Sequence, residues 1–262
     1  MPVKPVQEMT YDQLVCRVYG SNEEMGRAAA ERAAEVLQQA IQARGVANMV
    51  LAAANSQLTF LHALREIDAV NWQAVNVFHM DEYLGLPPGH PASFALFLRR
   101  HMIDNVAIGA FYPVPCRPED VDLASQAYEL LLKAHPVDLC CLGIGENGHV
   151  AFNEPPVADF EDPVWLKTVA LDEVSRQQQV GEGHYASLNE VPTHALTMTI
   201  SALRAAKEMI CIVPETRKAQ AVYDTLLGPV STACPASILR QTPYAVLYLD
   251  VDAASQIPEK GG

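Results

Sequence analysis

Positive charge is scarce in this chain. Its 262 residues include 18 lysines and arginines against 31 aspartates and glutamates, which gives a formal net charge of −13 at pH 7. Such an acidic surface repels phosphate backbones and anionic lipids, so we expect neither nucleic acid nor a membrane surface as a partner. An anionic small molecule can still bind where positive charge or backbone amides are concentrated locally.

Long apolar runs and paired cysteine motifs are also missing. No apolar stretch approaches the length of a membrane span, and residues 1–11 lack the apolar core of a signal peptide. The six cysteines form no C-x-x-C pair, and four of them lie in or beside apolar runs typical of strands. We therefore expect free, buried thiols and a cytoplasmic protein.

Segments typical of strands alternate with segments typical of helices. The expected strands are 16–19, 49–54, 75–80, 137–142, 208–213 and 244–251, and the expected helices are 23–43, 57–67, 93–102, 125–134 and 215–227. Ser21 and Glu24 form a capping box at the start of the longest helix, and Gly45 marks its end.

This alternation predicts an α/β protein. We expect a doubly wound, mostly parallel sheet with helices on both faces. Because 50% of the residues are hydrophobic and no repeat or flexible linker divides the chain, we expect a single domain over residues 1–262. The tails at 1–10 and 257–262 are expected to be loose.

A glycine-rich segment follows the expected strand 137–142. Residues 143–148 satisfy the G-x-G-x-x-G fingerprint of dinucleotide sites, which also needs a helix to begin at once and carry the pyrophosphate. The prolines at 155 and 156 would end such a helix within two turns. The segment therefore indicates a turn that presents Asn147, His149 and Glu154 at the carboxyl end of a strand, where open parallel sheets place active sites.

Two acidic residues, Asp81 and Glu82, follow the expected strand 75–80. They can reach the same edge of the sheet as His149, although strand ends also commonly carry solvated carboxylates. An aspartate has an ordinary pKa of about 3.9. A useful base therefore needs burial or a nearby like charge to raise its pKa, and Glu82 can supply that charge.

His149 is one of eight histidines, and a lone histidine more often serves packing or the surface. Gly148 beside it allows a close approach to a ligand, and Glu154 lies far enough along the turn to fold back and orient the imidazole. A metal site among these histidines and carboxylates is the alternative. No spacing such as H-x-x-x-H places two ligands on one helical face, so we expect no metal.

Two places in the sequence suit a phosphate group. Asn55 and Ser56 precede an expected helix, whose first amides and dipole attract an anion; simple capping by Ser56 is the alternative. Lys218 stands near the start of the expected helix 215–227, where a cation opposes the helix dipole. That cost is explained if Lys218 faces an anion.

Three groups of residues form a distinctive set: Met80-Asp81-Glu82-Tyr83-Leu84-Gly85-Leu86-Pro87, His90-Pro91-x-Ser93-Phe94, and the segment from Gly143 to Pro155. Together they resemble the glucosamine-6-phosphate deaminase/isomerase family, which is related to the 6-phosphogluconolactonases. His194-Ala195-Leu196-Thr197 and Arg217-Lys218-Ala219 look like later landmarks, so the resemblance covers most of the chain. The lactonases usually show a DER-type acidic motif instead.

The resemblance implies conversion of glucosamine 6-phosphate and water to fructose 6-phosphate and ammonia, without metal or redox cofactor. Asp81 would move the proton between C2 and C1 of the open-chain sugar, and His149 would help to open the ring. Glu154 and Asn147 would orient and tune His149. The residues expected to bind the substrate are Asn55, Ser56, Glu82, Gly145, Arg176, Gln179 and Lys218.

The sequence departs from the family pattern at four places. Asn147 is aspartate in some members, and an amide cannot stabilise an imidazolium as a carboxylate does. Ala54-Asn55-Ser56 replaces a glycine-rich phosphate turn. A phosphate-binding arginine falls near Gln179, and Arg176 is the expected substitute. Trp165 stands where members regulated by N-acetylglucosamine 6-phosphate have an arginine.

Three hypotheses about function therefore stay open. The leading one is a deaminase/isomerase with Asp81, His149 and Glu154 as its core. The second is a 6-phosphogluconolactonase in which His149 activates water, and the third is a sugar-phosphate-binding protein that has lost catalysis. We expect a phosphorylated amino sugar as partner, and the sequence leaves open whether the chain forms a homo-oligomer.

Overall fold

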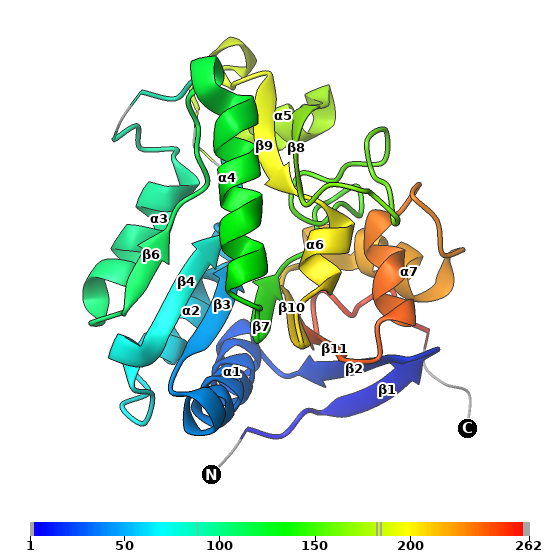
Figure 1. Cartoon of the computed structure of the whole chain (residues 1–262). Coiled ribbons are helices and arrows are strands. Elements are labelled where there is room, and N and C mark those ends of the chain that lie inside the picture. Colours follow the sequence, from blue (N-terminus) through cyan, green and yellow to red (C-terminus); the bar gives the residue numbers. More distant parts are fainter. Residues whose placement is uncertain (1–2, 88, 182, 184, 259–262) are drawn as a thin grey trace.

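A computed structural model describes residues 3–258 of the chain, except residues 88, 182 and 184 (Figure 1). The strands are β1 Gln7–Tyr11, β2 Leu14–Tyr19, β3 Ala47–Leu51, β4 Val75–His79, β5 Asp81–Tyr83, β6 Ala110–Tyr112, β7 Leu139–Leu142, β8 Leu166–Ala170, β9 His194–Met198, β10 Glu208–Val213 and β11 Ala245–Asp250. The α-helices are α1 Asn22–Arg44, α2 Leu58–Arg65, α3 Phe94–His101, α4 Val121–Ala134, α5 Glu173–Gly181, α6 Ile200–Arg204 and α7 Ala219–Leu227. The short 3-10 helices η1 Asn55–Gln57 and η6 Thr216–Lys218 lead into α2 and α7.

The main sheet confirms the predicted doubly wound α/β fold. Its strands lie in the order β1-β2-β11-β10-β7-β3-β4-β6. The first pair, β1 and β2, is antiparallel, and the other neighbours are parallel. Parallel neighbours need crossover connections, and the helices provide them. The carboxyl ends of β3, β4, β7 and β10 consequently meet at one edge of the sheet.

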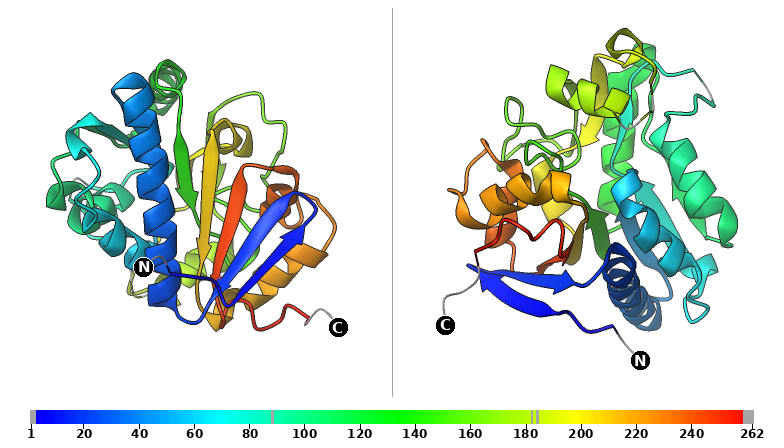
Figure 2. Two further views of the ribbon diagram at one scale, coloured as in Figure 1. Left: turned by 90° about the horizontal axis from the view of Figure 1, so that it is seen from below. Right: turned by 180° about the vertical axis from the view of Figure 1, so that it is seen from behind.

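Helices cover both faces of this sheet, as the continuous apolar strands require. Alternate residues of one strand belong to opposite cores: in β7, Cys140 packs with α4, α6 and α7, and Cys141 packs with α1, α2 and α3. Figure 2 shows α1 and α7 on opposite sides of the strands. All six cysteines are unpaired, and the four predicted in strands are buried, as expected.

A small second sheet, with strand order β5-β9-β8 and antiparallel pairs, stands beyond the carboxyl edge of the main sheet (Figure 1). It was not predicted. The aromatic side chains of Tyr83, Phe152 and Tyr185 pack beneath it in a separate cluster. Because β5 pairs with β9, which is far away in sequence, no local pattern of residues marks this sheet.

The ends of the chain differ in part from expectation. The tail expected to be loose over residues 1–10 contains most of β1, which pairs along its length with β2 and buries Met9. At the other end, Ile257 packs against the core, and residues 259–262 lie outside the described part of the chain. Among the residues described, no helix has the length and apolar character needed to cross a membrane.

The predicted ends of α1 are confirmed. The Ser21 hydroxyl accepts a hydrogen bond from the Glu24 amide at 3.2 Å, and the Glu24 carboxylate accepts one from the Gly20 amide at 3.1 Å. Gly45 ends the helix with φ of 78°, in the left-handed region that glycine adopts without strain. Ser56 does not cap α2, because η1 begins one residue earlier, at Asn55.

Candidate active site

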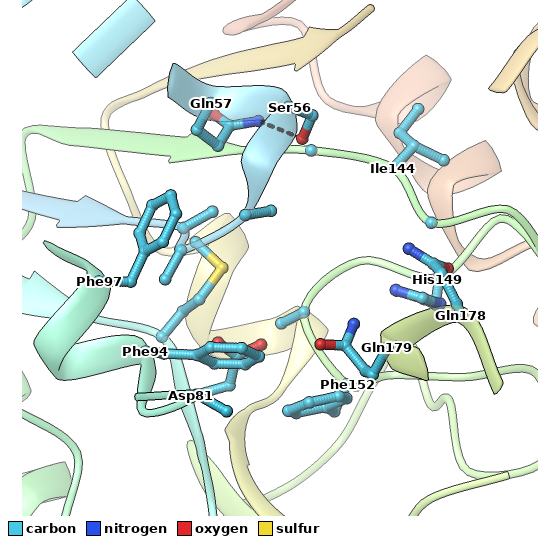
Figure 3. Close-up of a pocket in the computed structure, with 18 of the residues that line it drawn as sticks. Ser56, Gln57, Asp81, Phe94, Phe97, Ile144, His149, Phe152, Gln178 and Gln179 are labelled. Atoms are coloured by element: carbon cyan, nitrogen blue, oxygen red, sulfur yellow. Dashed lines mark hydrogen bonds between the residues drawn. The ribbon is translucent and has the colours of Figure 1, made fainter. Parts of the chain in front are cut away.

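A pocket lies where the chain leaves β3, β4, β7 and β10 (Figure 3). Its wall is formed by residues 52–54, 56 and 57 after β3, by 80 and 81, by the turn after β7 and by 217 and 218 after β10. The start of α3 and the side chains of Gln178 and Gln179 on α5 complete it. Of the predicted site residues, those that line the pocket are Ser56, Asp81, Gly145, His149, Gln179 and Lys218.

Asp81 is the carboxylate of this pocket. It is the first residue of β5, pairs with Thr197 of β9, and is only 6% exposed. Burial raises the pKa of its carboxyl group to about 8, and the negative charge of Glu82 adds to the increase. Both of the causes expected to raise this pKa, burial and the nearby charge of Glu82, are therefore present.

Glu82 does not line the pocket, which corrects its expected place among the substrate-binding residues. Its carboxylate accepts hydrogen bonds from the Ser93 hydroxyl at 2.7 Å and from the backbone amides of Phe94 and Ala95 at 3.2 and 3.1 Å. These groups form the start of α3, whose unpaired amides attract an anion. Glu82 therefore anchors the helix that brings Phe94 and Phe97 to the pocket.

The turn that carries His149 follows β7 directly. The Gly145 amide donates to the His149 carbonyl at 2.9 Å, and the Gly148 amide donates to the Gly145 carbonyl at 3.1 Å. All residues from 143 to 165 are described and none of them is helical, so the helix needed for a dinucleotide site is absent from this segment. The side-chain amide of Asn153 donates to the backbone carbonyl of Met198 at 2.8 Å, and this bond connects the turn to β9.

Asn147 holds the imidazole of His149. Its side-chain oxygen accepts from the His149 backbone amide at 3.1 Å and lies 2.7 Å from His149 Nδ1. Because an amide oxygen can only accept, Nδ1 carries the proton in this contact. Nε2 is then the acceptor nitrogen of the neutral ring, and the ring lines the pocket. The predicted pairing of Asn147 with His149 is present.

Gly145 lies beneath the same ring. A Cβ added at Gly145 would come within 2.0 Å of His149 Cε1 and within 2.3 Å of both ring nitrogens. Any larger residue would therefore push the imidazole out of its position. This close approach, rather than a left-handed backbone, explains why glycine stands here, since the φ of Gly145 is not positive.

Substitution Gly145→Ala is expected to lower turnover by about 10²-fold, because an imidazole displaced by about 1 Å no longer meets its reacting atoms. Thermal unfolding should change little, since the ring can swing toward the open pocket. Steady-state assays and a melting curve measure the two effects. Gly181→Ala is the matched control, because a Cβ there meets no described atom within 4 Å. Equal activity of the two variants would contradict this role of Gly145.

Glu154 is almost fully buried behind this turn, at 1% exposure. One carboxylate oxygen accepts from the backbone amide of Asp172 at 2.9 Å, and burial raises the pKa of the group. Asp172 was not predicted as part of the site. Its side chain accepts from the amide of Asn147 at 3.4 Å, so a path of hydrogen bonds runs from Glu154 through Asp172 and Asn147 to His149.

The lining of the pocket also includes two groups suited to an anion, Ser56 and Lys218. The Ser56 hydroxyl accepts from the side-chain amide of Gln57 at 3.2 Å, and the same amide donates to the Ile212 carbonyl at 3.1 Å (Figure 3). Asn55 belongs to η1 but does not line the pocket, unlike the expectation. Lys218 ends η6 and lines the pocket while being only 4% exposed.

Two arginines near the pocket are engaged with other parts of the protein. Arg217 lines the pocket and forms ion pairs with Glu215 at 2.5 Å and with Glu146 at 3.2 Å. Arg176 does not line it, which corrects its expected role at the phosphate. Its guanidinium donates to the Leu188 and Val191 carbonyls at 2.7 and 3.0 Å and holds that loop against α5.

Among the residues described, no three histidine, cysteine or acidic side chains gather closely enough to hold a metal ion. The chemical groups of the pocket include a buried carboxylate, an imidazole with a fixed tautomer and a buried ammonium. Gln57 and Gln178 also line it and were not predicted. Their amides carry no charge, so the charge pattern used to find an anion site could not reveal them.

Known proteins share both the sequence and this fold. Residues 20–247 match the family of glucosamine-6-phosphate isomerases/6-phosphogluconolactonase. The glucosamine-6-phosphate deaminase of Exiguobacterium sibiricum is 35% identical over 193 residues, which are 74% of this chain and 75% of that protein. The deaminase of Streptococcus thermophilus is 32% identical over 223 residues, or 85% of this chain and 93% of its own.

Solved structures agree with these matches. A monomeric glucosamine-6-phosphate deaminase superposes with a TM-score of 0.83 at 26% identity, over 92% of this chain and 98% of the other. The 6-phosphogluconolactonase of Trypanosoma brucei superposes with a TM-score of 0.76 at 15% identity, over 96% and 100%, which shows the common fold. The resemblance seen in the sequence is confirmed, and the chain belongs to the glucosamine-6-phosphate isomerase/6-phosphogluconolactonase family.

Proposed function

We propose that the protein is a glucosamine-6-phosphate deaminase, which converts glucosamine 6-phosphate and water to fructose 6-phosphate and ammonia. The observation that carries the proposal is the pairing of two groups in one pocket: Asp81, a buried carboxylate with a pKa of about 8, and the imidazole of His149. Relatives that are 30–35% identical over most of the chain are deaminases of this name.

In the proposed reaction, His149 begins by opening the sugar ring. Its Nε2 takes the proton of the C1 hydroxyl as the bond between C1 and the ring oxygen breaks, and the proton passes to that oxygen. Asn147 keeps the proton on Nδ1, so Nε2 is ready to accept. The open-chain product has an aldehyde at C1 and the amino group at C2.

Asp81 then moves a proton between carbons. Its carboxylate removes the proton from C2 and delivers it to C1, while the amino nitrogen loses one proton and O1 gains one, which converts the amino aldehyde to a ketose imine with a hydroxyl group at C1. Water adds to the imine and ammonia leaves. A base works best when its pKa is close to the working pH, which the burial of Asp81 provides. The ammonium group of the bound substrate favours the ionised form of Asp81.

The phosphate of the substrate is proposed to lie against Lys218, Ser56 and the first amides of η1, with Gln179 beside it. A buried ammonium is a strong partner for a phosphate dianion. The proposal also takes the chain as one catalytic domain of the cytoplasm, a reducing compartment that suits its six unpaired cysteines.

An assay of ammonia release tests the proposal. Glucosamine 6-phosphate, galactosamine 6-phosphate, N-acetylglucosamine 6-phosphate and free glucosamine are compared as substrates. We expect ammonia from glucosamine 6-phosphate and none from free glucosamine. Hydrolysis of 6-phosphogluconolactone without ammonia release would assign a lactonase. Thermal stabilisation by these sugar phosphates without turnover of any of them would assign a binding protein.

A further inference from the structure

Donor and acceptor positions around Asn147 admit only one orientation of its amide. The oxygen must face the His149 backbone, because a backbone amide can only donate there. The amide nitrogen then points away from His149, toward the Asp172 carboxylate at 3.4 Å. Asn147 therefore stands between an imidazole and a carboxylate, with its acceptor side matched to the first and its donor side to the second.

Asp172 is fixed from two other directions. Its second carboxylate oxygen accepts from the Ser175 amide at 2.7 Å and so caps the start of α5. Its backbone amide donates to Glu154 at 2.9 Å. The helix that Asp172 caps carries Gln178 and Gln179 into the pocket. Asp172 thus joins the turn of His149 to the helix whose Gln178 and Gln179 line the pocket.

We propose that Asp172 is a positioning residue for His149 that acts through Asn147, an inference that rests on the proposed function. The carboxylate holds the amide nitrogen of Asn147 and so keeps the amide oxygen on His149 Nδ1. Its negative charge, two hydrogen bonds from the ring, favours the imidazolium that forms during ring opening. Asn147 itself has no carboxylate. Asp172 provides one that is a further hydrogen bond away from the imidazole of His149.

Other charged groups near the imidazole also influence the pKa of His149 that the experiment would measure. Besides Asp172, the charged or titratable residues around its turn and pocket are Asp81, Glu146, Glu154, Arg217, Lys218 and Cys234. These groups remain in place when Asp172 alone is changed. A difference in the titration of His149 between wild type and an Asp172 variant therefore reports the Asp172 contact.

The test compares Asp172→Asn and Asp172→Ser with the wild type. Both residues cap helices about as well as aspartate, so α5 should remain capped. We expect kcat for ammonia release to fall about tenfold, the lower end of the effect found for residues that orient the histidine ligands of metal sites. Glu173→Gln is the matched control, because it removes one exposed carboxylate from the first turn of the same helix.

A second readout does not depend on turnover. ¹⁵N spectra of the histidine rings follow the titration of His149, whose signals are identified by their loss in His149→Gln. We expect a neutral ring protonated on Nδ1 and a His149 pKa that falls by about 0.5–1 unit in Asp172→Asn, since removal of a nearby negative charge disfavours the imidazolium. Glu173→Gln should shift it less, because its carboxylate is in solvent.

Identical titration of His149 in the wild type and Asp172→Asn, with only the melting temperature changed, would reduce Asp172 to a helix cap and overturn the inference. Absence of ammonia release by the wild type would instead refute the proposed function. The ring spectra would still measure the effect of Asp172 in that case, so the two failures can be told apart.

Discussion

Asp81→Asn is expected to lower kcat for ammonia release by about 10²- to 10⁴-fold, the range that general base catalysis contributes. Asparagine has nearly the shape of aspartate but cannot take the C2 proton. Binding of glucosamine 6-phosphate should persist, because Lys218, Ser56 and the rest of the pocket are unchanged. The measurement is steady-state kinetics together with a binding titration. An Asp81→Asn variant with wild-type kcat would contradict the role of Asp81.

The same substitution should stabilise the fold at alkaline pH. In the folded protein the Asp81 pKa is about 8, compared with an ordinary value of 3.8 for the free side chain, so the folded state binds this proton more tightly than the unfolded state. The stability contributed by this proton is therefore present in full below about pH 4 and is lost progressively as pH rises through 8. Asparagine does not ionise, so the variant does not lose this stability. Its free energy of unfolding should therefore rise relative to that of the wild type between about pH 4 and pH 8.

Melting temperatures at pH 5, 7 and 9 test this consequence. The difference between Asp81→Asn and wild type should grow in favour of the variant with increasing pH. Asp68→Asn is a control for the loss of one negative charge at an exposed site. A difference that is constant across pH would mean that Asp81 is not held in an unfavourable environment. Such a gain in stability with a loss of activity is common at catalytic residues.

Lys218→Met is expected to lower kcat/KM for glucosamine 6-phosphate by about 10²- to 10³-fold. Loss of one partner of a buried charge pair costs about 2–5 kcal/mol, and each 1.4 kcal/mol is about a factor of ten. The phosphate lies far from the carbons that react and is bound similarly throughout the reaction, so KM should rise more than kcat falls. Methionine retains the apolar stem of the buried lysine, which limits the damage to the core.

Arg217→Met is the comparison for this experiment. Its guanidinium pairs with Glu215 and Glu146 and is partly exposed, so its loss should raise KM less than about tenfold. Steady-state kinetics of both variants, with melting curves as a check on folding, measure the difference. Equal effects of the two substitutions, or an unchanged KM in Lys218→Met, would show that Lys218 does not bind the phosphate.

The main sheet could be predicted because its strands are continuous apolar runs separated by amphipathic helices. Polar and charged residues follow those runs directly, and this pattern alone predicted that Asp81 and His149 share one edge of the sheet. The small sheet could not be predicted. β8 alternates buried and exposed residues only weakly, and its pairing with β9, as well as that of β5, depends on contacts between distant segments.

Several residues were predicted to bind the substrate because of their residue type. In the structure their surroundings give them other contacts. Glu82 and Arg176 have the charges of ligand-binding residues, but helix amides and loop carbonyls occupy them. Asn55 lies in the expected turn but does not line the pocket, whereas its neighbour Ser56 does. Asp172 was missed because its sequence signature is that of an ordinary helix cap. Its contact with Asn147 exists only after the turn and α5 have folded together.

The most direct test of the proposed deaminase activity is the product balance of glucosamine 6-phosphate turnover by wild type and Asp81→Asn. Ammonia and fructose 6-phosphate are measured in the same reaction. We predict equal amounts of both from the wild type. We predict that the variant forms both products at least about 10²-fold more slowly. The substrate should still raise the melting temperature of the variant. Neither product from the wild type, or both at the wild-type rate from Asp81→Asn, would contradict the proposed function.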